Sequence, residues 1–299
     1  MERELVQAIA RSLGRDGGDT REIVGKGSVN RVFVADDLVV RLNHDRSPES
    51  ALAEYQKERW CSEQAGQVIR VPKVLDLDMR DGRAYTVSEI IAGVSSDERP
   101  EISWPILGRL LRAVHEIDGP ADEAERQELF GESRTPGEHW EWQRELNTAS
   151  LGSDDPLCRL GVYAAPELPV IRNAFERLRE VRFQFGLCHG DVTPRNLILA
   201  DDGEPALIDW GCASIEAVPA SDLVQIRMLH LLQGKPSEAE WEAFVAAYGP
   251  RAGDVLPLLP ALLVLKSFDL VRWAVDRCPA RVEEMVIKAR KLKAQIANP

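Results

Sequence analysis

Three polar side chains between residues 187 and 214 are of the types that chemistry on a metal-bound nucleotide requires. Asp191 and Asn196 are five residues apart, and Asp209 follows in the same stretch. Carboxylate and amide oxygens are the ligands that Mg²⁺ prefers in proteins. A further carboxylate nearby can orient a hydroxyl group and accept its proton. The residue types alone therefore suit chemistry on a magnesium nucleotide.

The sequence around these residues predicts a hairpin that brings two of them together. Residues 197–208 contain two apolar runs around an Asp-Asp-Gly turn, which is a strong hairpin signal. Because antiparallel partners face each other across about 5 Å, Asn196 and Asp209 are expected to meet at one end of the hairpin. Asp191 lies on the loop that leads into that end. An ordinary surface hairpin with scattered polar residues would not explain all three positions.

This arrangement resembles the active site of kinases. Protein kinases have a catalytic Asp, an Asn five residues later, and a metal-binding Asp after a short hairpin. Where they have Arg after the loop His and Phe-Gly after the last Asp, this chain reads His-Gly-Asp at 189–191 and Asp-Trp-Gly at 209–211. These departures resemble the aminoglycoside phosphotransferase and choline kinase-like family of small-molecule kinases. The resemblance implies an α+β, bilobal protein kinase-like fold, with an antiparallel β-sheet small lobe and a mostly helical large lobe.

The resemblance also implies a role for each of the three residues. Asp191 is expected to be the catalytic residue, which orients the acceptor hydroxyl and takes its proton late in the transfer. Asn196 and Asp209 are expected to hold Mg²⁺ against the phosphates of the donor, ATP or GTP. The implied reaction is transfer of the γ-phosphoryl group to a hydroxyl.

Three neighbouring residues are expected to support this stretch. By resemblance, His189 braces the catalytic loop and Asp222 tethers it, so both are structural. Arg195 remains open, because it could face phosphate or simply lie on the surface.

The small lobe should hold the nucleotide. Strands are expected in its sequence, one of them at residues 71–75. Gly25, Gly27 and Ser28 lie between two of the expected strands, where glycines let backbone N–H groups approach phosphates closely. The same residues also suit a plain turn, and only their place ahead of the catalytic stretch favours the phosphate role.

Arg41 stands on the next expected strand, where the kinase pattern has a lysine that contacts the α- and β-phosphates. A Glu on the helix expected at residues 48–64 would hold this cation in position. Glu54 and Glu58 lie one helical turn apart, and both could point toward it. Glu58 is favoured by its offset from the following strand.

The base of the nucleotide is expected to lie at the hinge after the small lobe. By resemblance, backbone groups of Ser88 and Ile90 would hydrogen-bond its edge. Ile208 is expected to form part of the apolar wall around it.

The acceptor is expected to bind in the large lobe, much of it in the helical region at residues 119–186. Carboxylates and aromatic rings suit amines and sugar rings, although a charged helix with two core tryptophans would show the same pattern. The candidate acceptor-binding residues are Glu138, Glu141, Glu145, Asp154, Asp155 and Asp269.

Length and composition limit the number of lobes, the partners and the cellular location that can be expected. Its 299 residues, 44% of them hydrophobic and 29% charged, predict two lobes: residues 1–93 for the nucleotide with the hinge, and residues 94–299 for catalysis and the acceptor. A net charge of −12 disfavours nucleic acid as a partner and allows a cationic small molecule. Five scattered cysteines and the lack of a long apolar run favour a cytoplasmic protein without a membrane partner. A monomer or a homodimer is expected.

The expected function is transfer of phosphate to an aminoglycoside antibiotic, which would confer resistance. The nearest alternative keeps the chemistry and changes the acceptor to a macrolide or to a metabolite such as choline or homoserine. A non-catalytic nucleotide-binding module is a further alternative, which the presence of Asp191 together with both metal ligands disfavours.

Overall fold

The computed structural model describes residues 2–23, 30–44 and 46–297. Its first part contains a five-stranded antiparallel sheet with the order β1-β2-β3-β5-β4. Asp36 and Asp81 have φ angles of 54° and 52° in the turns of the β2–β3 and β4–β5 hairpins, a conformation that Asp tolerates. The strands are β1 (Thr20–Glu22), β2 (Asn30–Ala35), β3 (Leu38–Asn43), β4 (Val74–Arg80) and β5 (Arg83–Glu89).

The strand predicted at residues 71–75 was misplaced, because β4 begins at Val74 and continues to Arg80. Pro72 has no backbone N–H for a ladder. The carbonyl of Lys73 accepts from the N–H of Glu89, but its own N–H donates to the Glu89 side chain and not to the backbone of β5. The tight turn to β5 fixes the register, so that Arg80 pairs with Arg83 and the strand runs the full length of the hairpin.

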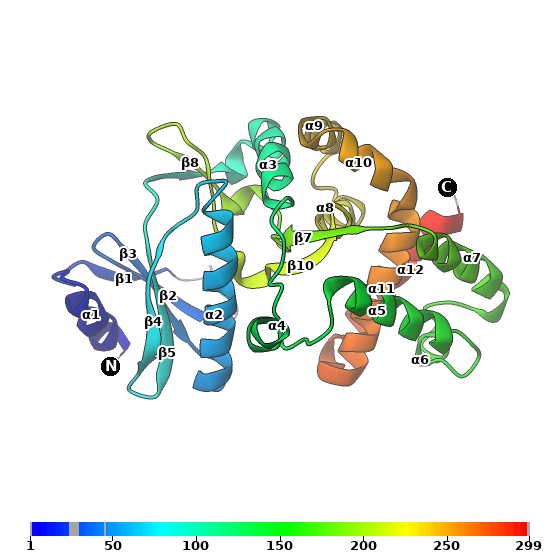
Figure 1. Cartoon of the computed structure of the whole chain (residues 1–299), viewed down its shortest axis with the longest axis horizontal. Coiled ribbons are helices and arrows are strands. Elements are labelled where there is room, and N and C mark those ends of the chain that lie inside the picture. Colours follow the sequence, from blue (N-terminus) through cyan, green and yellow to red (C-terminus); the bar gives the residue numbers. More distant parts are fainter. Residues whose placement is uncertain (1, 24–29, 45, 298–299) are drawn as a thin grey trace.

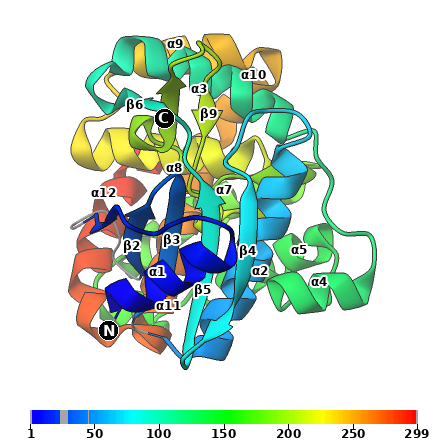
Figure 2. The ribbon, with the colours of Figure 1, turned by 90° about the vertical axis from the view of Figure 1, so that its left-hand side faces the viewer.

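Helices cover both faces of this sheet (Figures 1 and 2). Helix α1 (Glu2–Ser12) packs Val6 and Ile9 against Phe33 and other buried residues of β2, β3 and β5. Helix α2 (Pro48–Ala65) begins at Ser47, whose side chain accepts from the N–H of Ser50, as an N-cap residue does. Its residues Ala51 and Tyr55 pack against Ala84 of β5 on the opposite face.

Two small sheets lie between the first sheet and the helical part of the molecule (Figure 1). Strands β6 (Gly93–Ser95), β8 (Leu197–Ala200) and β9 (Ala206–Leu207) form one of them, with β8 in the centre. Strands β7 (Gln184–Cys188) and β10 (Ser214–Val218) pair antiparallel in the other. The catalytic stretch of the sequence thus runs from β7 through β8 and β9 to β10.

Most of the remaining described chain is helical, and its helices contribute most of one large core. Helix α3 packs against α9, and α11 packs against α12. In the core, Phe268 of α11 stacks on Tyr163 and meets the edge of Phe175. The helices are α3 (Pro100–Val114), α4 (Glu123–Phe130), α5 (Pro136–Ser150), α6 (Pro156–Arg159), α7 (Leu168–Arg179), α8 (Ala220–Gln233), α9 (Glu238–Tyr248), α10 (Pro250–Val255), α11 (Leu259–Arg277) and α12 (Val282–Ala297).

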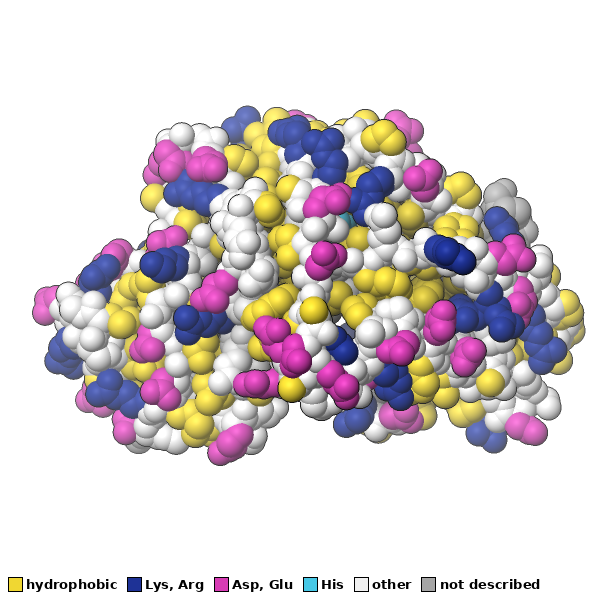
Figure 3. All heavy atoms as spheres, viewed as in Figure 1, with side chains coloured by type: hydrophobic (Ala, Val, Ile, Leu, Met, Phe, Trp, Pro, Cys, Tyr) yellow, Lys and Arg dark blue, Asp and Glu magenta, His cyan; other side chains and the backbone are white. Residues whose placement is uncertain are grey.

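The surface shows acidic and basic side chains interspersed, without one dominant patch of either sign on the face seen in Figure 3. All five cysteines are free. Among the described residues, none of the helices combines the length and the apolar character needed to span a bilayer.

Candidate active site

The predicted hairpin forms and places Asn196 and Asp209 at its open end. Leu197 pairs with Leu207, and the N–H of Ile208 donates to the carbonyl of Asn196 at 2.9 Å. Asp209 follows with φ 66° and ψ 69°, a conformation that non-glycine residues rarely adopt and that is concentrated at functional sites. This backbone turn leaves Asp209 exposed beside Asn196.

Asp191 lies within hydrogen-bond distance of Asn196. The Asn196 amide Nδ2 donates to the Asp191 carbonyl at 2.8 Å and to its carboxylate Oδ2 at 3.0 Å. Arg195 Nη2 donates to the same Oδ2 at 2.8 Å. The other carboxylate oxygen, Oδ1, accepts from no described residue and remains available for a hydroxyl group.

Asp222 holds the catalytic loop from beneath. Its carboxylate accepts from the backbone N–H groups of His189 and Gly190 at 2.9 and 2.8 Å, and from Nε2 of His115 at 3.0 Å. Burial would raise the pKa of Asp222, but the hydrogen bond and attraction of His115, with help from His189 and Gly190, hold it below its ordinary value. The carboxylate therefore stays ionised and ties the loop to α3 and α8.

His189 connects the loop to the hairpin. Its Nε2 lies 3.0 Å from the carbonyl of Ile208, and its Nδ1 accepts from the N–H of Asp191 at 3.3 Å. A carbonyl can only accept, so these partners assign the proton to Nε2. His189 is buried, and its ring packs edge-to-face with Trp210. This position fits the expected structural role of holding the loop against the hairpin.

Gly190 is required by the close approach of two loops. Its φ is +75°, and a Cβ at this position would overlap the carbonyl of Cys212. Only glycine fits both the conformation and the space, which explains why Gly stands between His189 and Asp191.

Strand β3 and helix α2 place a buried ion pair opposite the hairpin. Arg41 Nη2 lies 2.6 Å from Glu58 Oε1, whereas Glu54 pairs with the more exposed Arg46. Burial opposes the charge of Arg41, but the attraction and hydrogen bond of Glu58, together with the attraction of Asp209, raise the pKa of Arg41. The structure therefore brings together Arg41 and Glu58, the favoured one of the two glutamates.

Two oxygen donors at the hairpin end fit a magnesium ion. Asn196 uses its amide nitrogen toward Asp191, which leaves its amide oxygen as the atom that can ligate. A Cβ placed on Gly211 would lie 3.6 Å from Asp209 Oδ1 and 3.7 Å from Glu58 Oε2, so these carboxylates border the same space. Hard oxygen ligands of this kind, completed by phosphates and water, are what Mg²⁺ requires.

The expected hinge contacts stay a prediction. The N–H of Ile90 donates to the carbonyl of Asp37 at 3.1 Å, because the chain continues along β3 past the end of β5. Of the backbone groups of Ile90, the carbonyl is therefore the one that could contact a base. Ser88 lies within β5, opposite Val39, and Ile208 is half-buried at the end of the hairpin. Gly25, Gly27 and Ser28 lie outside the described residues.

A cavity of ≈ 190 Å³ opens beside the catalytic loop. Gly190 and Cys188 form the loop side, and Trp140 of α5 lies on another side. Four charged residues line it: Glu216 from β10, Asp222 from α8, and Lys266 and Asp269 from α11. Asp191 does not line this cavity, although its neighbour Gly190 does.

Asp269 is the one of the six candidate acceptor residues that lines this cavity. Its carboxylate accepts from Nδ2 of Asn147 on α5. Burial raises the pKa of Asp269 above the ordinary value, and the Asn147 hydrogen bond offsets part of this effect.

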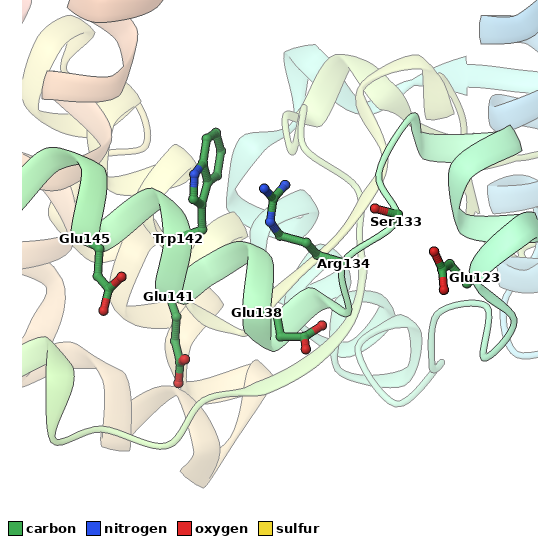
Figure 4. Close-up of a pocket in the computed structure, with 7 residues that line it drawn as sticks. All are labelled: Glu123, Ser133, Arg134, Glu138, Glu141, Trp142 and Glu145. Atoms are coloured by element: carbon green, nitrogen blue, oxygen red, sulfur yellow. The ribbon is translucent and has the colours of Figure 1, made fainter.

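Glu138, Glu141 and Glu145 do not reach the cavity at the catalytic loop. They line a separate depression of ≈ 460 Å³ together with Trp142 and other residues of α4, α5 and the connecting loop (Figure 4). Glu138 also caps α5, because its carboxylate accepts from the N–H and hydroxyl of Thr135. The glutamates occupy one face of α5, whereas Trp140 and Gln143 line the cavity of ≈ 190 Å³ beside the loop.

Asp155 is a structural residue and not an acceptor ligand. It is 4% exposed, caps α6, and forms two hydrogen bonds with Arg272 and one with Tyr163. Asp154, its neighbour, is exposed and lines neither cavity. The acceptor prediction for Asp155 was therefore wrong, whereas that for Asp154 stays a prediction.

Two charged residues of the cavity were missed in the sequence. Glu216 alternates along β10 with Ser214, so that both line the cavity, and this period of two was the available signal. Lys266 precedes Asp269 by one helical turn on α11 and therefore shares its face.

The chain matches a known family over most of its length. A profile described as the phosphotransferase enzyme family matches residues 20–259. The choline kinase LicA from Streptococcus pneumoniae is 16% identical, with coverage of 100% of this chain and 99% of that chain and a TM-score of 0.64. The macrolide 2'-phosphotransferase MphH from Brachybacterium faecium is 19% identical, with coverage of 99% and 98% and a TM-score of 0.60.

A third similar structure is a thermostable mutant of the aminoglycoside phosphotransferase APH(4)-Ia, in complex with AMP-PNP and hygromycin B. It is 17% identical, covers 99% of this chain and 100% of its own, and has a TM-score of 0.61. At these identities the likenesses show a shared fold. The predicted α+β, bilobal protein kinase-like fold is therefore confirmed.

Proposed function

Because the chain belongs to the phosphotransferase enzyme family, we propose that it transfers the γ-phosphoryl group of ATP or GTP to a hydroxyl of a small cationic molecule. The proposed acceptor is an aminoglycoside. The observation that carries this proposal is the grouping of Asp191, Asn196 and Asp209 at the open end of the hairpin, where Asp191 Oδ1 has no partner among the described residues. Gly190, the neighbour of Asp191, lines a cavity beside them. Residues 1–93 would bind the nucleotide and residues 94–299 the acceptor.

The reaction needs few chemical groups from the protein. The acceptor oxygen forms a bond to the γ-phosphorus while the bond from that phosphorus to the β–γ bridging oxygen breaks, and the nucleoside diphosphate leaves with the bond electrons. Asp191 orients the hydroxyl and receives its proton late, because the transition state of phosphoryl transfer is loose. Asp222 and His189 keep Asp191 in place through the hydrogen bonds of the loop.

Asn196 and Asp209 would hold Mg²⁺, which supplies charge neutralisation at the phosphates when bound. Arg41, fixed by Glu58, lies where it can contact phosphate oxygens from the small lobe. Arginine presents a planar fork for two oxygens where the kinase pattern has a lysine, so the contact with the phosphates would be bidentate.

The side chains of the cavity support a cationic, hydroxylated acceptor. Glu216 and Asp269 can pair with ammonium groups, and Trp140 offers an apolar face to a sugar ring. Lys266 reduces the negative charge of the cavity but stands against the three carboxylates of Glu216, Asp222 and Asp269. A macrolide would require a broad apolar pocket, and four charged side chains in this space do not favour one.

A small amino alcohol such as choline is the second candidate acceptor, and the size of the cavity favours it. Its ≈ 190 Å³ is below the roughly 300–1,000 Å³ of pockets that enclose drug-sized ligands. An aminoglycoside would place a single amino sugar ring in the cavity and leave its other rings outside.

The proposal is tested by nucleotide turnover with purified protein, Mg²⁺, ATP or GTP, and a panel of aminoglycosides, macrolides and amino alcohols. Asp191→Ala serves as the blank. Turnover that depends on an aminoglycoside and disappears in the variant is the expected result. Turnover with amino alcohols alone would favour the second candidate. Binding of nucleotide without turnover by any acceptor would contradict the proposal and favour a binding module.

A further inference from the structure

Arg195 occupies a position in the active site that the proposed reaction does not yet use. Its Nη2 lies 2.8 Å from Asp191 Oδ2, and its side chain is 63% exposed. Within the described part of the chain, Nε and Nη1 of Arg195 have no hydrogen-bond partner. Four of the five N–H groups of a guanidinium are therefore unused.

The backbone of Arg195 is fixed although its guanidinium is exposed. Ser95 donates its hydroxyl to the carbonyl of Arg195 at 3.2 Å, and Ser96 donates to the carbonyl of Pro194 at 2.8 Å. Residues 194–196 form a single 3₁₀ turn before β8. The backbone of Arg195 is thus held in place, whereas its exposed guanidinium can exchange one hydrogen-bond partner for another.

The charges around Arg195 also point toward the reacting phosphate. Arg195 pairs directly with Asp191, and its neighbour Asn196 accepts from the N–H of Ile208, the residue before Asp209. Arg195 therefore lies near both the catalytic carboxylate and a metal-binding carboxylate. The phosphoryl group in transfer must lie between the acceptor hydroxyl on Asp191 and the metal ligands.

Two other cations of the described chain have partners away from Asp191. Arg41 is tied to Glu58 inside the small lobe, and Lys57 donates to the carbonyl of Gly211 at 3.3 Å. Ion pairs as exposed as that of Arg195 with Asp191 are weak, so a phosphate with several acceptor oxygens can replace the carboxylate.

We propose that Arg195 is a further catalytic residue, which leaves Asp191 and contacts the γ-phosphate when the nucleotide binds. Its positive charge then lies beside the oxygens of the phosphoryl group as they pass from the nucleotide to the acceptor. The same movement frees Asp191 Oδ2. The inference rests on the proposed phosphoryl transfer and adds a residue to it.

The test compares Arg195→Gln and Arg195→Lys with the wild-type protein in two measurements. Calorimetry with Mg²⁺ gives the affinities for AMP-PNP and for ADP, which differ in the γ-position. We expect Arg195→Gln to lose about 10-fold in affinity for AMP-PNP and less than about 2-fold for ADP. Steady-state kinetics should show kcat about 10²-fold lower for Arg195→Gln, with part of the loss recovered in Arg195→Lys.

Arg59→Gln is the matched control, because Arg59 forms an ion pair of the same spacing with Glu63 on α2 and is similarly exposed. It should leave both affinities and kcat unchanged. Equal loss of AMP-PNP and ADP affinity, or full affinity for both nucleotides, in Arg195→Gln would overturn the proposal. The binding comparison needs no acceptor, so it decides on Arg195 even if no acceptor is turned over and the proposed function fails.

Discussion

Arg41 and Glu58 form an ion pair at 2.6 Å that joins strand β3 to helix α2 inside the small lobe. Glu58→Gln should lower the free energy of unfolding by about 2–3 kcal/mol, because it leaves the charge of Arg41 without its partner. The KM for the nucleotide should rise as Arg41 loses its fixed position. Urea denaturation and donor kinetics measure the two effects.

Glu54→Gln is the control for this prediction. Because Glu54 is half-exposed, its substitution should lower the free energy of unfolding by less than about 0.5 kcal/mol. Equal effects of both substitutions would contradict the assignment.

Asp191→Ala should lower kcat by about 10²-fold or more while magnesium nucleotide still binds, because the variant loses the group that orients the hydroxyl and accepts its proton. Single-turnover kinetics and nucleotide titration separate these effects. A variant with full turnover would remove Asp191 from the mechanism.

Asp209→Ala should weaken nucleotide affinity only when Mg²⁺ is present. The reason is that Asp209 would contact the phosphates through the metal and not directly. Titrations with and without the metal check this expectation. Equal weakening in both conditions would show that Asp209 is not a metal ligand.

Asp222→Asn should lower the free energy of unfolding by about 3 kcal/mol at pH 7. The pKa of Asp222 is lowered in the folded protein, so its ionised form contributes stability above the unfolded pKa. This contribution is lost as the pH falls below about 4 toward the folded pKa. The difference between wild type and variant should therefore shrink in acid, as measured by urea denaturation from pH 7 to pH 3.5. A constant difference would assign the effect to packing instead.

Asp269→Asn should raise the KM for a cationic acceptor by about 10-fold, because it removes one carboxylate from the lining of the cavity. The raised pKa of Asp269 means that affinity for a cation should fall as the pH drops through that pKa in wild type but not in the variant. Glu141→Gln is the control, since Glu141 lies on the outer face of α5. An equal rise in KM for Glu141→Gln and Asp269→Asn would contradict the assignment of the acceptor to the cavity lined by Asp269.

The sequence was sufficient for the residues that local patterns determine. The family resemblance is confirmed by the match over residues 20–259. The Asp-Asp-Gly turn fixes the hairpin register, and that register alone brings Asn196 to Asp209. Helical spacing offered two glutamates for Arg41, and the structure brings the favoured one, Glu58, to it.

Residues whose role depends on tertiary packing could not be placed from the sequence. Glu138 and Trp140 are two residues apart on α5, yet one lines the outer depression and the other the cavity beside the catalytic loop. The choice depends on how α5 packs on α11 and β10, which no local pattern reveals. Asp155 resembled a free carboxylate because its partner Arg272 is distant in the sequence.

Strand β6 is a connection between the small lobe and the large lobe. Strand β6 starts at Gly93, directly after the hinge, and pairs with β8, while the N–H of Asp201 donates to the carbonyl of Ala92. Any side chain at Gly93 would overlap the carbonyl of Leu199. The hairpin with Asn196 is also joined to the segment before β4, because the N–H of Leu207 donates to the carbonyl of Arg70 and Arg70 pairs with Asp202. A rotation of the small lobe would therefore carry the hairpin along or break these contacts.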